Sequence, residues 1–146
     1  MTDDAALVLA RRCAEAMYAE DRASQHLGIQ ISDVAPGRAT AHMVVTDTMI
    51  NGHEICHGGY IALLADTAFA FACNTYNRRT VAQGCDVSFL ESARLGDELA
   101  AEAVERARRG RGGIYDVTVR RQGGDVVAEF RGRSRVIAGT LVDEGA

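Results

Sequence analysis

Residues 57–74 decide the fold of this chain and read HGGYIALLADTAFAFACN. The run from Tyr60 to Cys73 is too long for a strand, and its many Ala and Leu residues favour a helix. Asp66 is the one charged residue in this run, so the helix is apolar nearly all round. A helix of that kind is buried on all sides. The sequence therefore predicts a long buried central helix over residues 57–74.

Strand patterns lie on both sides of the central helix. Two strands precede it, joined by the turn dipeptide Pro36-Gly37, over residues 27–34 and 38–45. Four strands follow it, separated by glycine-rich turns, over residues 81–89, 98–108, 113–122 and 126–137. Short successive strands favour antiparallel pairing. We therefore expect an α+β fold in which an antiparallel sheet of about six strands wraps the central helix.

The N-terminal segment, residues 1–25, adds a further helix. Ala10, Ala14 and Met17 fall on one face of a helix over about residues 3–22, and Thr2 or Asp3 can cap its start. The chain contains a single proline, and no internal repeat or low-complexity stretch divides its 146 residues. We therefore expect one domain over residues 1–146.

The composition excludes several classes of protein. The formal net charge of −4 argues against a nucleic-acid partner, because duplex-binding proteins are expected to be basic. All 16 basic residues are Arg, so the chain has no lysine for Schiff-base or P-loop chemistry. No apolar run reaches the roughly 18 residues of a membrane span. Charged residues interrupt the N-terminal apolar run, which argues against a secretory signal of the usual kind. We expect a cytoplasmic protein whose four cysteines are reduced and mostly buried, namely Cys13, Cys56, Cys73 and Cys85.

Asp66 and the pair Gly58-Gly59 are the candidate catalytic residues of the central helix. A carboxylate in an apolar setting needs a partner or has a raised pKa. Asp66 is therefore either a structural residue bonded to a neighbouring loop, or a general base or nucleophile. Gly58 and Gly59 begin the same helix, where free N–H groups and the positive end of the helix dipole suit an oxyanion hole. The alternative for the glycine pair is a flexible joint between loop and helix.

The spacing of these residues predicts a second chain. Gly58 and Asp66 lie about 12 Å apart along one helix, at ~1.5 Å rise per residue. Catalytic groups must reach one reacting centre by hydrogen bonds, and an Asp side chain does not cover that distance. Two such helices packed antiparallel about a two-fold axis would place Gly58 of one chain opposite Asp66 of the other. We therefore expect an obligate homodimer with two composite sites.

The loop before the helix contains a competing motif. Residues 53–57 match H-E-x-x-H, the pattern of zinc hydrolases, which needs both histidines on one face of a helix. Asn51-Gly52 before these five residues and Gly58-Gly59 after them leave too short a segment for a stable helix, so we expect a loop without metal. His57 either caps the central helix or orients a substrate. Asn51 either begins a turn or places its amide near an attacking water.

Two groups of arginines occur late in the chain. One surrounds a predicted turn and consists of Arg106, Arg108, Arg109 and Arg111. The other alternates along the last strand beside Ser134 and consists of Arg131, Arg133 and Arg135. They form either a solvated surface or a binding site for ligand phosphates, which guanidinium groups fit well. The aromatic residues, including Phe89, belong to the core or line an acyl pocket.

The chain resembles the hotdog-fold acyl-CoA thioesterases of phenylacetic acid degradation. The resemblance covers residues 26–137, and its most specific part is His57-Gly58-Gly59 followed by Leu64-Ala65-Asp66-Thr67-Ala68-Phe69-Ala70. It implies a hotdog fold, with subunits that join their sheets in pairs and often form tetramers. It also implies that Asp66 is the catalytic carboxylate and that Gly58 or Gly59 polarises the thioester carbonyl. Asn51 and His57 match residues that line the site, and coenzyme A binds along the subunit interface with no metal.

These observations together predict hydrolysis of an acyl-CoA thioester to a carboxylic acid and coenzyme A, which is part of the substrate rather than a cofactor. The resemblance favours phenylacetyl-CoA or ring-hydroxylated phenylacetyl-CoA. We expect Asn51 and Thr67 to position the water or the carboxylate. The candidate residues for binding coenzyme A are Arg133, Ser134, Arg109 and Phe89. The competing hypotheses are a hotdog enoyl-CoA hydratase or dehydratase, and an acyl-CoA binding protein without catalytic activity.

Overall fold

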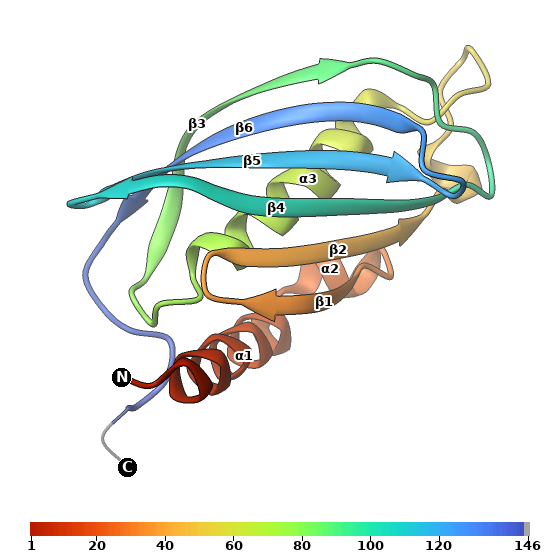
Figure 1. Ribbon diagram of the computed structural model, residues 1–146. Helices are drawn as coiled ribbons and strands as arrows, with labels where there is room; N and C mark the ends of the chain where they lie inside the picture. The colour runs from red at the N-terminus through yellow and green to blue at the C-terminus, as the bar shows by residue number, and fades with distance from the viewer. Residues whose placement is uncertain (145–146) are drawn as a thin grey trace.

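The fold is built on one antiparallel sheet of six strands (Figure 1). The computed structural model describes residues 1–144. The strands are β1 (Gln30–Ala35), β2 (Arg38–Val44), β3 (Thr80–Phe89), β4 (Glu98–Arg109), β5 (Gly112–Arg121) and β6 (Val126–Val136). They lie in the order β1-β2-β4-β5-β6-β3, and every neighbouring pair is antiparallel. The predicted α+β fold is confirmed.

Turn chemistry explains why the strand limits follow the prediction closely. Gly37 between β1 and β2 has φ +73°, and Gly123 between β5 and β6 has φ +93°. Glycine adopts these left-handed angles at no steric cost, so it marks the turns in the sequence. The first strand is the exception, since it begins at Gln30 rather than at residue 27. Residues 27–29 instead continue the hydrogen bonds of a preceding helix, because the Ile29 N–H donates to the carbonyl of Ser24.

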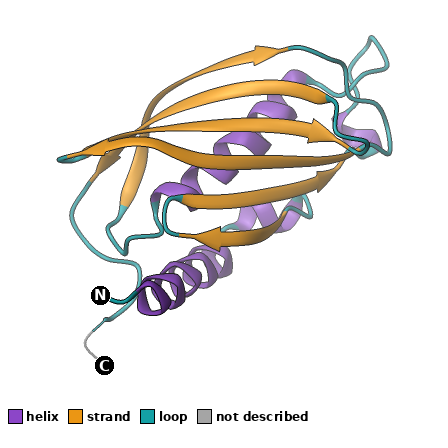
Figure 2. Cartoon of the chain, in the orientation of Figure 1, coloured by secondary structure: helices purple, strands orange, loops and turns teal. Residues whose placement is uncertain are grey.

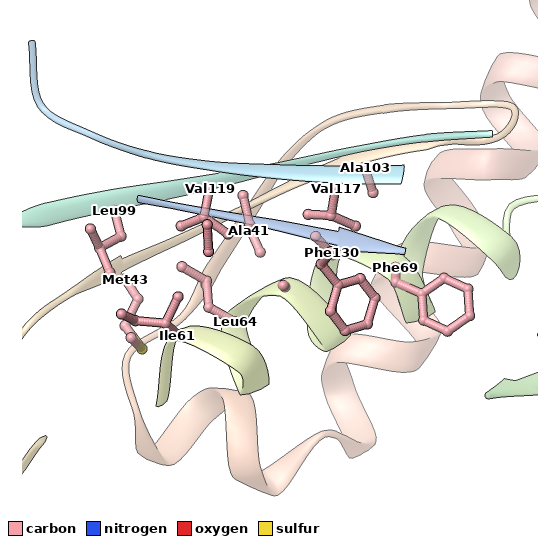
Figure 3. Close-up of a cluster of buried hydrophobic side chains, with 14 of the residues drawn as sticks. Ala41, Met43, Ile61, Leu64, Phe69, Leu99, Ala103, Val117, Val119 and Phe130 are labelled. Atoms are coloured by element: carbon pink, nitrogen blue, oxygen red, sulfur yellow. The ribbon is translucent and has the colours of Figure 1, made fainter. Parts of the chain in front are cut away.

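The central helix α3 (Gly58–Cys73) lies against one face of the sheet (Figure 2). His57 caps its start and Asn74 its end, which agrees with the predicted limits. Leu64 has no exposed surface and packs among Met43, Leu99 and Val119 (Figure 3). Burial of such side chains contributes about 1.5–3 kcal/mol each to folding, so the contact between helix and sheet stabilises the fold substantially.

Phe69 and Gly132 make the closest contact between α3 and the sheet. A Cβ atom on Gly132 would lie 2.8 Å from the ring of Phe69, which is too close for two non-bonded carbon atoms. The same ring also packs against Tyr115 and Phe130, with centroid separations of 5.7 and 5.9 Å. The aromatic ring therefore has no free direction in which to move.

The N-terminal segment forms two helices, α1 (Asp3–Glu20) and α2 (Arg22–His26), where the sequence predicted one helix over 3–22. Asp21 separates the two helices, with a non-helical ψ of 85°, and its carboxylate accepts a hydrogen bond of 3.0 Å from the Ser24 N–H. The break follows from this capping interaction, which satisfies an N–H group at the start of α2. The Tyr18 hydroxyl ties α1 to the sheet by donating to the Ile29 carbonyl at 2.7 Å.

One face of α3 stays accessible in the single chain, so the expected burial on all sides does not hold within it. This open face consists of Gly59, Leu63, Asp66 and Ala70. These residues follow helical spacing on one side of the helix, while most residues on its other side are buried. The adjacent edge strand β3 is also accessible along its length, with Thr80 its one buried residue. Long uncovered edge strands are positions where another chain can pair.

The contact between Phe69 and Gly132 yields a test of the packing. We expect Gly132→Ala to lower the free energy of unfolding by about 1–3 kcal/mol, because the new methyl group forces the Phe69 ring out of its position. Urea unfolding monitored by circular dichroism measures the change. Gly52→Ala is the matched control, since its Cβ meets nothing within 4 Å. Equal stability of the two variants would contradict the described packing.

Candidate active site

The first turn of α3 leaves one backbone N–H free to bind a ligand. His57 Nδ1 accepts a hydrogen bond of 2.9 Å from the Gly59 N–H. The His57 N–H in turn donates to the Met49 carbonyl at 2.8 Å. Among residues 1–144, the structure gives the Gly58 N–H no acceptor. The helix start therefore offers Gly58 as an oxyanion donor, whereas Gly59 already serves the cap.

A groove of about 340 Å³ opens beside Gly58. It brings together Asn51, Gly58 and Phe89, three of the predicted site residues, along with Leu90. A Cβ on Gly58 would lie 3.0 Å from the Phe89 ring, so the glycine lets the ring pack directly over the helix start. Phe89 is 51% exposed and Leu90 59%, which leaves an apolar wall open to a ligand. Sequence analysis did not single out Leu90, although its place directly after Phe89 was an available signal.

Asn51 shapes the loop that leads into α3. Its side-chain oxygen accepts hydrogen bonds from the backbone N–H groups of His53, at 2.9 Å, and Ile55, at 3.3 Å. This is the turn-forming role that Asn side chains favour. The same turn places Glu54 at φ +61°, outside the helical region. Residues 53–57 therefore do not present two histidines on one helix face, and residues 1–144 contain no group of three His, Cys, Asp or Glu side chains able to hold a metal ion.

Asp66 lies on the open face of α3 rather than in the groove. Loss of hydration beside the helix raises the pKa of its carboxyl above the usual value. Within the part of the chain that the structure describes, this carboxylate has no hydrogen-bond or ion-pair partner. The alternative that Asp66 is a structural residue bonded to a neighbouring loop therefore finds no support in this part of the chain. Thr67 is buried, unlike Asp66, and its hydroxyl donates a hydrogen bond of 2.8 Å to the Leu63 carbonyl.

The predicted residues for binding coenzyme A are not gathered in one place. Arg133 lies on the outer face of the sheet and donates to Asp86 at 2.9 Å. Ser134 is buried on the opposite face, beside Gly113. Arg109 is exposed at the end of β4, next to the turn into β5. Alternation of side chains along a strand separates Arg133 from its neighbour in sequence.

Cysteine chemistry has little support in the structure. Cys13, Cys56 and Cys73 are buried and Cys85 is exposed, which confirms the expectation of mostly buried thiols. Burial raises the pKa of Cys73 to about 12 and also raises the pKa of Cys13 and Cys56. These three thiols are therefore protonated at neutral pH, and a protonated thiol is a poor nucleophile.

No helix within residues 1–144 combines the length and the apolar character needed to cross a bilayer.

Sequence comparison places this site in a known context. The family profile described as Thioesterase superfamily matches residues 53–128, which include the helix start and Asp66. The chain is similar to acyl-coenzyme A thioesterase PaaI of Escherichia coli, with 44% identity over 90% of this chain and 94% of that protein. It is also similar to a putative esterase of Archaeoglobus fulgidus, with 30% identity over 85% of this chain and 80% of that protein.

Solved structures give the same result. The PaaI protein from the phenylacetic acid degradation operon of E. coli superposes with a TM-score of 0.90 and 42% identity, covering 92% of this chain and 97% of that one. The TT0310 protein of Thermus thermophilus superposes with a TM-score of 0.77 and 33% identity, covering 80% of this chain and 98% of that one. The predicted hotdog fold is confirmed.

The environment of Asp66 predicts an unusual titration. We expect its carboxyl carbon to titrate above the ordinary Asp value in a ¹³C NMR experiment, because desolvation penalises the charged form. Asp97 is an internal control, since hydrogen bonds from Gln122 and the Arg94 backbone lower its pKa. A raised folded pKa means that charged Asp66 destabilises the fold above that pKa, and that this penalty fades as pH falls through it towards the unfolded value. Titration of Asp66 at or below Asp97 would contradict the described environment.

Proposed function

The chain belongs to the Thioesterase superfamily and is a thioester hydrolase, and from this we propose that it hydrolyses acyl-CoA thioesters to the free acid and coenzyme A. One observation carries the proposal for the site. Within residues 1–144, the N–H group of Gly58, a residue that lines the groove, has no acceptor, and the Asp66 carboxylate on the same helix has a raised pKa and no partner. The first group fits a developing oxyanion and the second fits a general base.

The proposed site uses two chains. Gly58 and Asp66 of one helix are about 12 Å apart, too far for both to act on one carbonyl. The open face of α3 and the accessible strand β3 lie next to each other, and both lack a covering element in the single chain. A second copy that pairs its β3 antiparallel to this one would extend the sheet and set the two α3 helices side by side. Asp66 would then face the partner's helix start, in a dimer that can pair again into a tetramer.

The proposed reaction follows from these positions. The thioester carbonyl oxygen accepts a hydrogen bond from the Gly58 N–H of one chain. Asp66 of the other chain removes a proton from water as the water oxygen adds to the carbonyl carbon. The tetrahedral intermediate then collapses, the C–S bond breaks, and the sulfur leaves and takes up the proton. In the alternative route Asp66 itself adds to the carbonyl carbon, the C–S bond breaks and the thiolate of coenzyme A leaves, and water then cleaves the resulting anhydride to give the acid and restore the Asp66 carboxylate. Neither route requires a metal or a prosthetic group, and coenzyme A enters as part of the substrate.

In this proposal His57 and Asn51 position the start of α3 and the loop that precedes it. The His57 Nδ1 bond to Gly59 fixes the helix start, so the Gly58 N–H keeps a constant direction. Asn51 fixes the loop through its side-chain oxygen, which leaves its amide nitrogen available to a water in the groove. Thr67 supports the backbone next to Asp66 through its bond to Leu63.

The proposed acyl group is arylacetyl, either phenylacetyl or ring-hydroxylated phenylacetyl. The exposed ring of Phe89 and the side chain of Leu90 line the groove beside Gly58, and an aromatic acyl group would pack against them. The similar E. coli protein comes from a phenylacetic acid degradation operon, which supports the same choice. A cytoplasmic location fits an acyl-CoA substrate and an exposed reduced Cys85.

Turnover of a panel of acyl-CoA esters tests the proposal directly. We expect arylacetyl esters to be hydrolysed, and Asp66→Asn to lower kcat by about 100-fold or more, because the amide cannot accept the proton from water. The acid product is quantified, since the exposed Cys85 would also react with thiol reagents. Asp4→Asn, an exposed substitution in the first turn of α1, is the control.

Three results would contradict this account in different ways. Undiminished turnover in Asp66→Asn would remove the carboxylate from the mechanism. Addition of water to a 2-enoyl-CoA without release of coenzyme A would indicate a hydratase. Tight binding of acyl-CoA esters with no turnover of any of them would indicate a binding protein.

A further inference from the structure

Three side chains of the edge strand β3 face the helix α3, namely Cys85, Val87 and Phe89. Each is paired across β6 with a buried residue, and directly paired residues point to the same face of a sheet. One of these paired residues, Gly132, contacts the Phe69 ring of α3, which identifies the face. Because β3 is the outermost strand of the sheet (Figure 1), Cys85 and Phe89 are exposed in the single chain and Val87 is half-buried.

Two of these side chains lie at the levels of the proposed reacting groups along α3. The Phe89 ring lies over Gly58, since a Cβ atom on that glycine would be 3.0 Å from it. Cys85 is paired with Gly132, which contacts α3 about one turn after Asp66. Cys85 and Phe89 are four residues apart, about 13 Å at ~3.3 Å per residue in a strand. This separation matches the distance of about 12 Å between Gly58 and Asp66, so Cys85 lies at the level of Asp66.

The matching distances select one register for the pairing of β3 with a second copy. When Gly58 faces the partner's Asp66, the two-fold axis passes midway between these two positions of the helix. The same level on β3 is Val87, midway between Cys85 and Phe89. Val87 then lies opposite Val87 of the partner subunit, and Phe89 lies opposite the partner's Cys85. Side chains that face α3 meet side chains that face the partner's α3, as an axis perpendicular to the sheet requires.

Charge on the outer face of β3 favours the same register. Asp86 points away from α3 and accepts a hydrogen bond of 2.9 Å from Arg133 on that face. With Val87 at the axis, Asp86 lies opposite Ser88 of the partner subunit, a residue whose hydroxyl can donate to a carboxylate. A shift of the axis to Asp86 would place two carboxylates directly opposite each other, and like charges in that position destabilise a strand pair.

Resting on the dimer and function proposed above, we infer that β3 pairs with its copy about Val87 and that the partner's Cys85 lines the acyl groove beside Phe89. Phe89 and Leu90 form the apolar wall of this groove next to Gly58. The partner's Cys85 continues this wall towards the partner's Asp66. An unionised cysteine packs as a small apolar side chain, so it leaves room for an aromatic acyl group. Cys85 is therefore a specificity-determining residue, and its thiol takes no part in the bond-making steps.

Disulfide cross-linking tests the register without any turnover. In Val87→Cys/Cys85→Ser the two introduced thiols of a dimer lie opposite each other, with Cα atoms about 4.5–5.5 Å apart, a distance that a disulfide spans. We expect oxidation with diamide to convert this variant to a covalent dimer on non-reducing electrophoresis. Phe89→Cys with the native Cys85 should also cross-link. The native protein is the control, because its two Cys85 thiols are about 13 Å out of register and should not join.

Two outcomes of the cross-linking would overturn the inference. The first is a disulfide between the native Cys85 thiols of two chains, which would move the axis away from Val87. The second is the absence of cross-linking in either variant while its circular dichroism spectrum remains that of the native fold.

Acyl selectivity tests the role of Cys85 in the groove. Cys85→Met lengthens the side chain, so we expect the KM for an arylacetyl-CoA to rise about ten-fold or more, while the KM for acetyl-CoA stays unchanged. A merely structural effect would change both values alike. Val81→Met is the matched control, since Val81 is exposed on the opposite face of the same strand, and it should change neither KM.

The results separate this inference from the proposed function. An equal change in both KM values for Cys85→Met, or no change in either, would overturn the role of Cys85 while thioesterase activity stays in place. Failure of wild type to hydrolyse any acyl-CoA would instead contradict the proposed function. Cross-linking then still decides the register, and dissociation constants of the two esters, measured by calorimetry with the same variants, take the place of the KM values.

Discussion

The fixed rise of the α-helix separates the first N–H groups of α3 from its own Asp66 carboxylate by about 12 Å. Packing against the sheet makes that separation rigid, because Leu64 and Phe69 are fully buried and leave the helix no freedom to bend. The helix therefore carries both halves of the proposed hydrolytic site and cannot join them by itself. The accessible open face of α3 and the uncovered edge strand β3 are the structural counterpart of this constraint, since they are the surfaces through which a second copy would complete the site.

The hydrogen bond from the Gly59 N–H to His57 Nδ1 connects stability to chemistry at the helix start. Because Nδ1 accepts this bond, the proton of the neutral imidazole resides on Nε2. The cap uses one donor of the first turn and leaves the Gly58 N–H as the donor next to the groove. The two roles of His57 that the sequence left open, helix cap and site residue, are then compatible, because the cap sets the direction of the neighbouring Gly58 N–H.

Local sequence signals predicted the sheet and the central helix because turn glycines and a long Ala-rich run determine them. The break at Asp21 escaped prediction because it depends on a side-chain hydrogen bond to the Ser24 backbone, which competes with continuation of the helix. The apolar pattern of the central helix predicted burial on all sides and did not reveal the accessible face around Asp66, since an apolar helix looks the same whether its own sheet or a partner covers it. Arginine pairing depends on cross-strand register, so the ion pair of Arg133 with Asp86 could be identified only once β3 and β6 were placed.

Complementation between two inactive variants tests the two-chain site most directly. Asp66→Asn removes the proposed base, and Gly58→Pro removes the proposed N–H donor at the first helical position, where proline is tolerated. The φ and ψ of His57, −57° and 130°, already suit a residue before proline, and Gly58→Ala controls for the added carbon atoms. Refolding the two inactive variants together should restore about one quarter of wild-type kcat, because half of the dimers are mixed and each mixed dimer has one intact composite site. Activity that stays at the level of the separate variants, in a mixture shown to contain mixed dimers, would contradict a site shared between chains.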